Sequence, residues 1–399
     1  MKNVLEYLEK SAADYPFKIA AADDKKECSY QELIRDAKKI GTALSRRFTV
    51  NSPVPIFMEK SVDTLKLFFG AVYAGCFYVL LNPELPSVRI GHIAETLEAK
   101  LIVTEKARTD ALKEILPQAE VITFEELTCE ESDENTLLSI RENMIDTDPL
   151  YANFTSGSTG VPKGVLISHR SVIDFINNFT QIFSITQEDV IGNQAPFDFD
   201  VSVKDIYSAV KTGATLQIIP KALFSSPASL LDHICEREIT TMIWAVSALC
   251  LISAFHGLDY KVPEKVNKIL FSGETMPRKH LDNWMNALKN AEFVNLYGPT
   301  EITCNCTYHK VQRDRDYADG LPIGKAFPNE RVFLLNDENN IITKPGVTGE
   351  ICVSGTALGL GYYNNPEQTN SRFVQNPANK NYIEPIYLSL IHISEPTRP

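Results

Sequence analysis

Apolar and polar residues alternate along the N-terminal part of the chain in two periods, one typical of helices and one of short buried strands. A helix is predicted to begin after Ser29, because a Ser N-cap followed by Glu32 has the spacing of a capping box. Pro53–Phe57 and Lys100–Thr104 have the short apolar runs of buried strands, and Thr64–Gly75 is an apolar helical stretch that ends in glycine. The N-terminal residues also have apolar side chains at helical spacing.

The pattern divides the chain into three parts. The alternation of helices and strands through residues 1–150 predicts a mostly parallel sheet covered by helices. From Tyr151 a Gly/Ser/Thr-rich loop is followed by further alternation to about residue 310. Residues 311–387 are rich in short β stretches separated by Asn, Asp, Pro and Gly, as in a small barrel or twisted sheet. We therefore predict an α/β fold with approximate subdomains 1–150, 151–310 and 311–387.

Composition narrows the class of protein. The 399 residues fit one large composite domain or two to three subdomains. A formal net charge of −12 argues against a nucleic-acid surface, which needs clustered Lys and Arg. No apolar run approaches the roughly 20 residues of a membrane span, and the N-terminus has no apolar core of a signal peptide. The eight cysteines are scattered without a Cys-x-x-Cys pair, which favours buried free thiols in the cytoplasm over a metal site or a disulfide framework.

The most informative stretch is the loop TSGSTGVPKG, from Thr155 to Gly164. Its glycines let backbone N–H groups point into one concavity, its hydroxyl groups add donors, and Lys163 adds a positive charge. A strand is predicted on each side, which a flexible linker rarely has. The loop is not a Walker loop, because that pattern requires Gly-Lys followed by Ser or Thr, and here Lys163 precedes Gly164. The stretch predicts a cradle for the phosphates of ATP.

This loop resembles the signature of the adenylate-forming superfamily, which includes amino-acid adenylation domains of peptide synthetases, D-alanine–carrier-protein ligases, acyl-CoA synthetases and luciferases. Further stretches typical of that superfamily follow in order over nearly the whole chain: Ser29–Leu33, Tyr73–Gly75 with Asn82-Pro83, Phe199–Val203, Asn295–Glu301 and Gly349–Gly355. The resemblance implies an N-terminal core of two helix-flanked, mostly parallel sheets and a small distorted β-barrel. It implies ATP and Mg²⁺ as cofactors.

The nucleotide-binding residues are carried over by position from this resemblance. In the segment Tyr297–Glu301, Tyr297 would stack on the purine, Thr300 would offer its hydroxyl to the α-phosphate, and Glu301 would supply the hard oxygen that Mg²⁺ needs. Without the other stretches this pentapeptide would indicate only a turn. Lys163, Thr300 and Glu301 are the predicted catalytic residues. The full nucleotide set is Thr155, Ser156, Gly157, Ser158, Thr159, Gly160, Lys163, Gly273, Glu274, Asn295, Tyr297, Gly298 and Thr300.

Asp200 decides the predicted substrate class. In amino-acid-activating members of the superfamily, an Asp at this place in the Phe-Asp-x-Ser pattern receives the α-ammonium group of the substrate. A buried carboxylate is costly unless it is paired, and a bound ammonium would supply that pair. The alternative is that Asp200 is only a helix N-cap. Asp198 lies two residues earlier, and Asp200 is preferred because the Ser202-Val203-x-Asp205 spacing of the family follows it.

A mixed side-chain pocket is implied by position. In it, Lys204 could pair with a carboxylate on an acidic substrate side chain, or it could point to solvent from the start of a helix. A small substrate such as alanine or serine stays open, and Trp244 and Leu296 would narrow the cavity. The predicted substrate-binding set is Asp200, Val201, Lys204, Trp244, Leu270, Ser272, Leu296, Cys304 and Asn305.

The implied mechanism has two half-reactions. The amino-acid carboxylate attacks the α-phosphorus of ATP, giving aminoacyl-AMP and pyrophosphate, and the protein mainly positions reactants and offsets charge. A thiol, the phosphopantetheine of a partner carrier protein, then attacks the mixed anhydride to form a thioester. The superfamily normally inserts a catalytic Lys from a small C-terminal domain that rotates between these steps.

The resemblance stops after Tyr387, where the superfamily would continue with Arg or Lys and then Thr-Gly-Asp. Residues 388–399, LSLIHISEPTRP, resemble the translation of a transposase adapter used in sequencing libraries. We therefore expect an adenylation core over residues 1–387 followed by a non-native tail that packs against nothing. On this reading the chain lacks the ribose-binding Asp, the hinge and the lid domain with the catalytic Lys.

Three readings of function remain open at this stage. The first is an amino-acid adenylating ligase, either a free-standing ligase of the D-alanine–carrier-protein type or the first domain of a peptide synthetase. The second is a carboxylate–CoA ligase of the same superfamily, against which Asp200 argues. The third is a non-catalytic remnant that binds nucleotide or amino acid. The identity of the amino acid, the native C-terminal sequence and the oligomeric state are not determined by the sequence.

Overall fold

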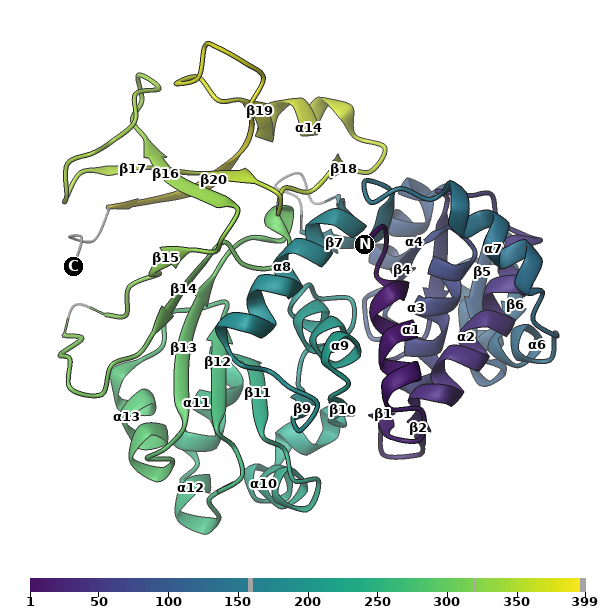
Figure 1. Cartoon of the computed structure of the whole chain (residues 1–399), viewed down its shortest axis with the longest axis horizontal. Helices are drawn as coiled ribbons and strands as arrows, with labels where there is room; N and C mark the ends of the chain where they lie inside the picture. The colour runs from purple at the N-terminus through teal and green to yellow at the C-terminus, as the bar shows by residue number, and fades with distance from the viewer. Residues whose placement is uncertain (157–160, 319, 395–399) are drawn as a thin grey trace.

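The computed structural model describes residues 1–156, 161–318 and 320–394, which form three sheets with helices packed around two of them (Figure 1). The predicted α/β class with two helix-flanked, mostly parallel sheets is confirmed. The C-terminal β-rich part is an open four-stranded antiparallel sheet and not a closed barrel. Each of the two larger sheets takes strands from more than one of the three predicted sequence blocks, whose boundaries remain a prediction.

The seven-stranded sheet has a parallel centre and an antiparallel edge. Its order is β18-β8-β7-β4-β3-β5-β6, with β8 antiparallel to β7 and β18 antiparallel to β8. Helices α4 (Ser87–Thr96) and α5 (Thr109–Ile115) cover one face through Ile90, Ile93 and Leu112. The strands are β3 (Pro53–Phe57), β4 (Phe77–Leu80), β5 (Leu101–Thr104), β6 (Glu120–Thr123), β7 (Pro149–Thr155), β8 (Lys163–Ser168) and β18 (Gly361–Tyr362).

The nine-stranded sheet has the order β15-β14-β13-β12-β11-β9-β10-β1-β2, with six parallel strands from β13 to β1. Its two faces are covered by different helices. One face is covered by α8 (His169–Ile182) and α9 (Val201–Thr212), and the other by α10 (Pro227–Glu236), α11 (Val246–Ala254) and α13 (Arg278–Ala287). The strands are β1 (Ile19–Ala22), β2 (Glu27–Ser29), β9 (Val190–Asn193), β10 (Thr215–Ile218), β11 (Thr241–Ala245), β12 (Lys268–Ser272), β13 (Glu292–Tyr297), β14 (Thr307–Lys310) and β15 (Lys325–Ala326).

The helices confirm the local signals in the sequence. The Ser29 side chain accepts from the backbone N–H of Glu32, whose carboxylate accepts from the Ser29 N–H, so the predicted capping box begins α2. No described helix has the length and apolar character needed to cross a membrane. The helices are α1 (Leu5–Asp14), α2 (Tyr30–Ser45), α3 (Val62–Tyr73), α4 (Ser87–Thr96), α5 (Thr109–Ile115), α6 (Phe124–Thr128), α7 (Glu134–Asn143), α8 (His169–Ile182), α9 (Val201–Thr212), α10 (Pro227–Glu236), α11 (Val246–Ala254), α12 (Gly257–Tyr260), α13 (Arg278–Ala287) and α14 (Pro366–Arg372), with short 3₁₀ turns η1 (Lys106–Arg108), η2 (Lys221–Ser225) and η3 (Thr300–Ile302).

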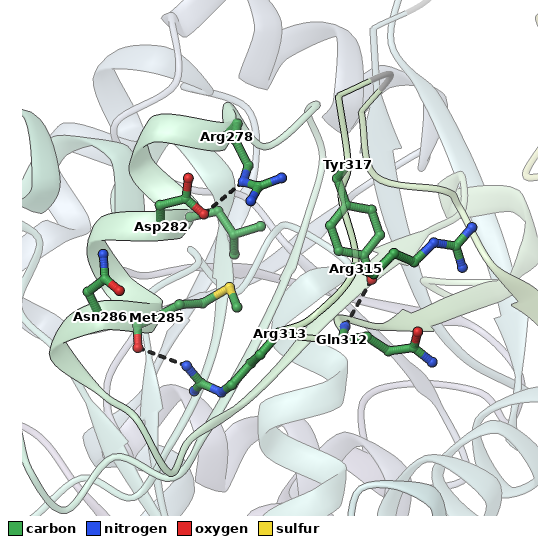
Figure 2. Close-up of a pocket in the computed structure, with 9 residues that line it drawn as sticks. Arg278, Asp282, Met285, Asn286, Gln312, Arg313, Arg315 and Tyr317 are labelled. Carbon is green, nitrogen blue, oxygen red and sulfur yellow. Dashed lines mark hydrogen bonds and ion pairs between the residues drawn. The ribbon is translucent and has the colours of Figure 1, made fainter.

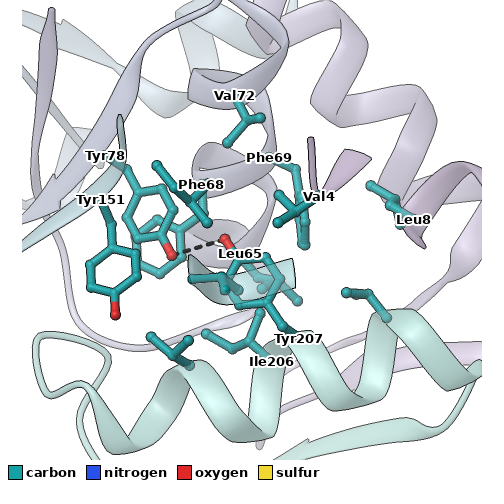
Figure 3. Packing of buried hydrophobic residues seen from close by; sticks show 14 of the residues in the cluster. Val4, Leu8, Leu65, Phe68, Phe69, Val72, Tyr78, Tyr151, Ile206 and Tyr207 are labelled. Carbon is teal, nitrogen blue, oxygen red and sulfur yellow. Dashed lines mark hydrogen bonds between the residues drawn. The ribbon is translucent and has the colours of Figure 1, made fainter. Parts of the chain in front are cut away.

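A shared core joins the two large sheets. Side chains of α3, β4, β7 and α9 meet in it (Figure 3). The ring of Phe68 stacks on Tyr78 with 4.0 Å between centroids, and the Tyr78 and Tyr207 hydroxyls are 2.9 Å apart. Because this cluster is buried and includes residues from both sheets, the two sheets are held in a fixed relation and can position one site between them.

The four-stranded sheet corrects the expectation for the tail. Residues 385–394 form β20, in which Leu388 pairs with Cys352 and the backbone of His392 pairs with Glu350. Residues 388–394 were expected to pack against nothing, and that expectation is wrong. A run of apolar and β-branched residues has high strand propensity and satisfies the backbone groups of β17. The origin of the tail as an adapter stays a prediction, and residues 395–399 lie outside the described residues. The strands are β16 (Glu330–Leu335), β17 (Thr348–Gly355), β19 (Phe373–Gln375) and β20 (Pro385–Ser394).

Candidate active site

Most of the predicted site residues lie where parallel strands end. Asp200 follows β9, Ser272 ends β12, and Tyr297 ends β13. Because the carboxyl ends of parallel strands share one edge of a sheet, these residues from distant parts of the sequence lie near one another, as is usual for ligand sites in α/β folds.

The predicted phosphate loop joins β7 to β8. These strands are antiparallel and Thr155 pairs with Lys163, so the two strand ends that flank the loop lie side by side. Gly157, Ser158, Thr159 and Gly160 lie outside the described residues. Lys163 is partly buried, and its ammonium lies 5.3 Å from the centre of the Tyr362 ring, a cation–π distance. This contact helps to hold the Lys163 ammonium in place at the end of the loop.

The segment after β13 makes a tight turn. Gly298 has no room for a Cβ atom, which would lie 2.4 Å from the Cα of Asn305. The 3₁₀ turn η3 follows, and then Thr303 and Cys304 have φ values of 52° and 74°, an uncommon conformation for residues other than glycine. The Thr303 hydroxyl donates to the Ala357 carbonyl at 2.7 Å and holds this conformation. Strained turns of this kind occur where a site must be held in one arrangement.

Glu301, on this turn, has aromatic hydroxyl partners. The Tyr362 hydroxyl donates to Glu301 Oε1 at 2.7 Å. Tyr387 also lies near both Glu301 and Tyr362. Burial, followed by the nearby Glu301 charge, raises the pKa of both tyrosines, so both stay protonated at neutral pH. With Lys163 beside Tyr362, the two predicted catalytic groups are connected through one ring.

Asp200 is at the N-cap position of α9 but makes no side-chain cap hydrogen bond, so capping does not account for it. Burial raises the pKa of its carboxyl group, while the Lys204 charge and the nearby Thr300 side chain oppose that shift. The Cys304 thiol donates to the Asp200 carbonyl at 3.0 Å. Asp198 is engaged elsewhere, because its carboxylate accepts from Asn82 Nδ2 at 3.0 Å. Asp200 therefore lies between the predicted substrate-binding residues Lys204 and Cys304 and the turn that contains Thr300.

Lys204 does not point to solvent. Its side chain is fully buried in α9, and Nζ donates to Asn305 Oδ1 at 2.6 Å. Burial lowers the pKa of the ammonium, and the negative charges of Asp200 and Asp205 oppose that shift. A buried cation needs compensation, which the Asn305 carbonyl and these carboxylates provide. The solvent-facing alternative is thus wrong, whereas the pairing with a substrate carboxylate stays a prediction.

The remaining nucleotide residues are arranged around the ends of β12 and β13. Gly273 has a φ of 97° and, like Glu274, is exposed just after β12. The Asn295 amide donates to the Pro322 carbonyl at 2.9 Å. Tyr297 is partly buried, and burial raises the pKa of its hydroxyl, against the opposing effect of Ser389 of β20. Their contacts to a nucleotide remain predictions.

Trp244 is not with the other substrate-side residues. Leu270, Leu296 and Cys304 belong to the core on the α9 side of the nine-stranded sheet, but Trp244 lies on the opposite face. Its indole N–H donates to the Gly192 carbonyl at 2.7 Å. Because side chains alternate along a strand, the neighbouring Ile243 faces the side that Trp244 was expected to occupy. The prediction that Trp244 narrows the cavity is wrong.

Ile243, Tyr362 and Tyr387 are residues whose position at the site was missed. Period-two alternation in β11 is the signal that finds Ile243. No local signal identifies Tyr362, because its partner Glu301 is 61 residues away and the two meet only through the pairing of β18 with β8. Tyr387 stood out in the sequence only as the last residue of the resemblance.

A cavity of about 330 Å³ lies apart from these residues, between α13 and the 312–317 segment (Figure 2). Its arginines already have partners. Arg313 donates to the carbonyls of Met285, Leu288 and Ala291, and Arg278 pairs with Asp282. Arg315 lies over the Tyr317 ring. These contacts hold the end of α13 against the 312–317 segment, so the arginines serve local structure and do not indicate a ligand site.

Comparison with known proteins identifies the family. Residues 8–363 match the family described as AMP-binding enzyme. The chain belongs to this family. Membership makes it an adenylate-forming, AMP-binding ligase domain, and the site between the sheets is the region where the family resemblance places the nucleotide.

Similar curated proteins are synthases that are mostly much longer. The chain is 27% identical over 380 residues to tyrocidine synthase 1 of Brevibacillus parabrevis, covering 94% of this chain and 34% of that protein. It is 29% identical to gramicidin S synthase 1 of Brevibacillus brevis, covering 94% of this chain and 33% of that protein. Zwittermicin A synthase ZmaJ of Bacillus cereus is 29% identical, with 93% of this chain and 71% of that protein covered. The chain thus spans about a third of the length of the first two.

Solved structures share the fold. The nonribosomal peptide synthetase FmoA3 superposes with a TM-score of 0.86 at 23% identity, covering 97% of this chain and 40% of that chain. The N-terminal subdomain of Klebsiella oxytoca NpsA, in complex with 3-hydroxybenzoyl-AMSN, superposes with a TM-score of 0.81 at 20% identity. That match covers 100% of this chain and 98% of the subdomain. At these identities the likeness establishes the fold.

Proposed function

We propose that this chain activates an amino acid with ATP, as the adenylation core of a peptide-synthetase-type ligase. The observation that carries the proposal is the Asp200 carboxylate, which has no capping role and lies beside Thr300 at the edge of the sheet. A substrate ammonium at Asp200 would place the adjoining carboxylate toward the Thr300–Glu301 turn. The similar curated proteins, synthases of tyrocidine and gramicidin S by name, support the same assignment.

In the proposed reaction, a carboxylate oxygen of the amino acid forms a bond to the α-phosphorus of ATP as the bond to the β-phosphate oxygen breaks. The products are aminoacyl-AMP and pyrophosphate, and no proton needs to move. Lys163 would offset the charge of the departing phosphates, and Thr300 would donate to the α-phosphate. Positioning of the two reactants is the main contribution of the protein.

The Glu301–Thr300 turn fits a magnesium ion. Glu301 offers a carboxylate oriented by tyrosine hydroxyls, and Mg²⁺ prefers one or two carboxylates together with substrate phosphates. When bound, the ion would neutralise phosphate charge during transfer. Glu301 would hold it.

We further propose that the adenylate is passed to a phosphopantetheine thiol on a carrier protein, with no side chain of this chain acting as nucleophile. The tyrocidine and gramicidin S synthases, as relatives, support this partner.

A cytoplasmic location is consistent with the eight cysteines, all of which are free thiols. The adapter origin of residues 388–399 belongs to the same proposal, and sequencing of the gene past the Tyr387 codon with an independent library chemistry tests it.

For the substrate side chain, the buried Lys204 supports an acidic amino acid. With the substrate ammonium at Asp200, the Lys204 charge loses part of its compensation, and a side-chain carboxylate would restore it. A small amino acid remains the alternative. Substrate profiling of Lys204→Ala separates the two, since an unchanged preference would exclude the acidic class.

The decisive experiment uses paired ligands. Aminoacyl-sulfamoyl-adenosines, which mimic the adenylate, are titrated against this chain together with the matched mimics that lack the amine. We expect the amine to strengthen binding about 100-fold, and Asp200→Asn to remove that gain, because truncating one partner of a buried charge pair costs about 2–5 kcal/mol.

Asp198→Asn is the matched control and should leave the gain intact, because Asp198 is occupied by Asn82. Equal affinity of the wild-type chain for both members of each pair would contradict amino-acid activation. It would favour a carboxylate ligase for substrates without an amine.

A further inference from the structure

The contacts of Tyr362 are unusual for a core tyrosine. Its hydroxyl donates to the Glu301 carboxylate at 2.7 Å, and its ring lies 5.3 Å from the Lys163 ammonium. The Tyr362 side chain thus contacts both the proposed metal ligand, Glu301, and the proposed phosphate-binding cation, Lys163.

The surroundings hold this ring in place. Its backbone N–H donates to Thr369 Oγ1 at 2.9 Å, and its ring packs edge-on against Phe373 with 5.8 Å between centroids. Phe373 in turn packs on Tyr387, with 5.4 Å between ring centroids, and Tyr387 lies near both Glu301 and Tyr362. β18 also pairs with β8 at Val165, two residues after Lys163, so the backbone of Tyr362 is held beside the strand that carries Lys163.

We propose that Tyr362, supported by Tyr387, is a positioning residue that orients the Glu301 carboxylate toward a metal–nucleotide complex and holds the Lys163 ammonium beside it. The inference rests on the proposed nucleotide site. A carboxylate ligand that accepts hydrogen bonds from fixed donors presents its remaining lone pairs in one direction, and loss of such a donor typically weakens metal affinity about 10–100-fold. A cation over a ring is likewise held in place.

The test measures binding of Mn²⁺ in the presence of ATP to the full chain, by the electron paramagnetic resonance signal of free Mn²⁺. Tyr362→Phe keeps the ring and removes only the hydroxyl. We expect about tenfold weaker Mn²⁺·ATP binding, with the affinity for AMP measured in EDTA unchanged. A residue that serves only to pack the core would lower thermal stability without separating these two affinities.

Tyr363→Phe is the matched control. Tyr363 is the next residue, its ring packs edge-on against Phe77 at 5.5 Å, and it is not part of the Glu301 contacts. An equal loss in both variants, or no loss in Tyr362→Phe, overturns the proposal. So does a wild-type chain whose ATP affinity does not depend on Mn²⁺.

A second variant tests the ring. Tyr362→Leu removes both hydroxyl and ring, and it should additionally weaken metal-free ATP relative to AMP, because Lys163 loses its support near the outer phosphates. The folded fraction is followed by thermal unfolding, so that affinities are compared for folded protein. The paired adenylate mimics described above test the Asp200 assignment independently, so failure of that assignment and failure of this one are distinguishable.

Discussion

The two faces of the nine-stranded sheet are formed by the same strands but carry different kinds of side chain. On the α9 side, Lys204, Asp205 and Asn305 are buried polar groups, and they lie among Ile243, Leu270 and Leu296. The side covered by α10, α11 and α13 packs Trp244, Trp284 and Phe271 with aliphatic side chains. Both faces are buried, so burial alone does not tell which of them carries the site.

The difference lies in how polar groups are satisfied. Each indole on the second face gives its one N–H to a backbone carbonyl, Trp244 to Gly192 and Trp284 to Leu249, and neither N–H remains unpaired. On the first face, Asp205 has one carboxylate oxygen bonded to Asn193 and the other without a hydrogen-bond partner among the described residues. Incompletely satisfied polar groups in a core are expensive and are retained mainly where they act. We therefore propose that the first face recognises the ligand and that the second contributes mainly to stability.

Among the tests of this division, the substitution Trp244→Ala has the largest expected effect. The indole is fully buried and edge-on to Phe224 at 5.4 Å, so its removal should cost about 3–5 kcal/mol of unfolding free energy. Denaturant unfolding measures the loss. The affinity of the folded variant for the adenylate mimics should not change, and Trp244→Phe, which keeps most of the volume, should recover much of the stability. A change in mimic selectivity would instead place Trp244 at the site.

An intermediate effect concerns the charge on the first face. Burial raises the pKa of Asp205 to about 7, against the opposing effects of Asn193, Lys204 and Lys60. The unfolded value is about 3.9, so between these pH values the folded state binds more protons than the unfolded one. The contribution of Asp205 to stability is therefore present below about pH 4 and is lost as pH rises through about 7.

Asp205→Asn removes this titration and keeps an oxygen that can accept from Asn193. Relative to the wild type, its free energy of unfolding should rise by about 2 kcal/mol between pH 5 and pH 8. Urea unfolding of both proteins at the two pH values gives this difference, and groups such as His169 cancel because both proteins contain them. A difference that does not vary with pH would show that Asp205 is ionised in the folded protein throughout.

Some features of the fold and of the candidate site could be predicted from the sequence, and others could not. Local signals were sufficient where a few neighbouring residues determine the structure. The capping box at Ser29 and the strand at Pro53–Phe57 are examples. The order of motifs predicted the family, and the family resemblance in turn implied the two sheets.

Two kinds of feature could not be obtained that way. Trp244 was placed by position, and a shift of one residue along a strand exchanges its faces. The Glu301–Tyr362 contact and the strand β20 depend on pairing between segments far apart in the chain, which no local pattern encodes. Lys204 is intermediate, since the sequence indicated its place on α9 and only packing showed that it is buried.

The smallest and most selective test is Ile243→Val against Ile269→Val. Both isoleucines are fully buried in adjacent parallel strands, Ile243 in β11 on the first face and Ile269 in β12 on the second. Each substitution removes one methylene and should cost about 0.5–1.5 kcal/mol of stability. The stability measurement therefore does not distinguish them.

Ligand selectivity should distinguish them. If the first face forms the wall of the substrate side, Ile243→Val makes room for one methylene, and the ratio of affinities for the 2-aminobutyryl and alanyl adenylate mimics should rise by up to about tenfold. Ile269→Val should leave that ratio as in the wild type. Equal ratios in all three proteins would mean that the site does not extend to β11, and the substrate would then be recognised by Asp200 and the Thr303–Asn305 turn alone.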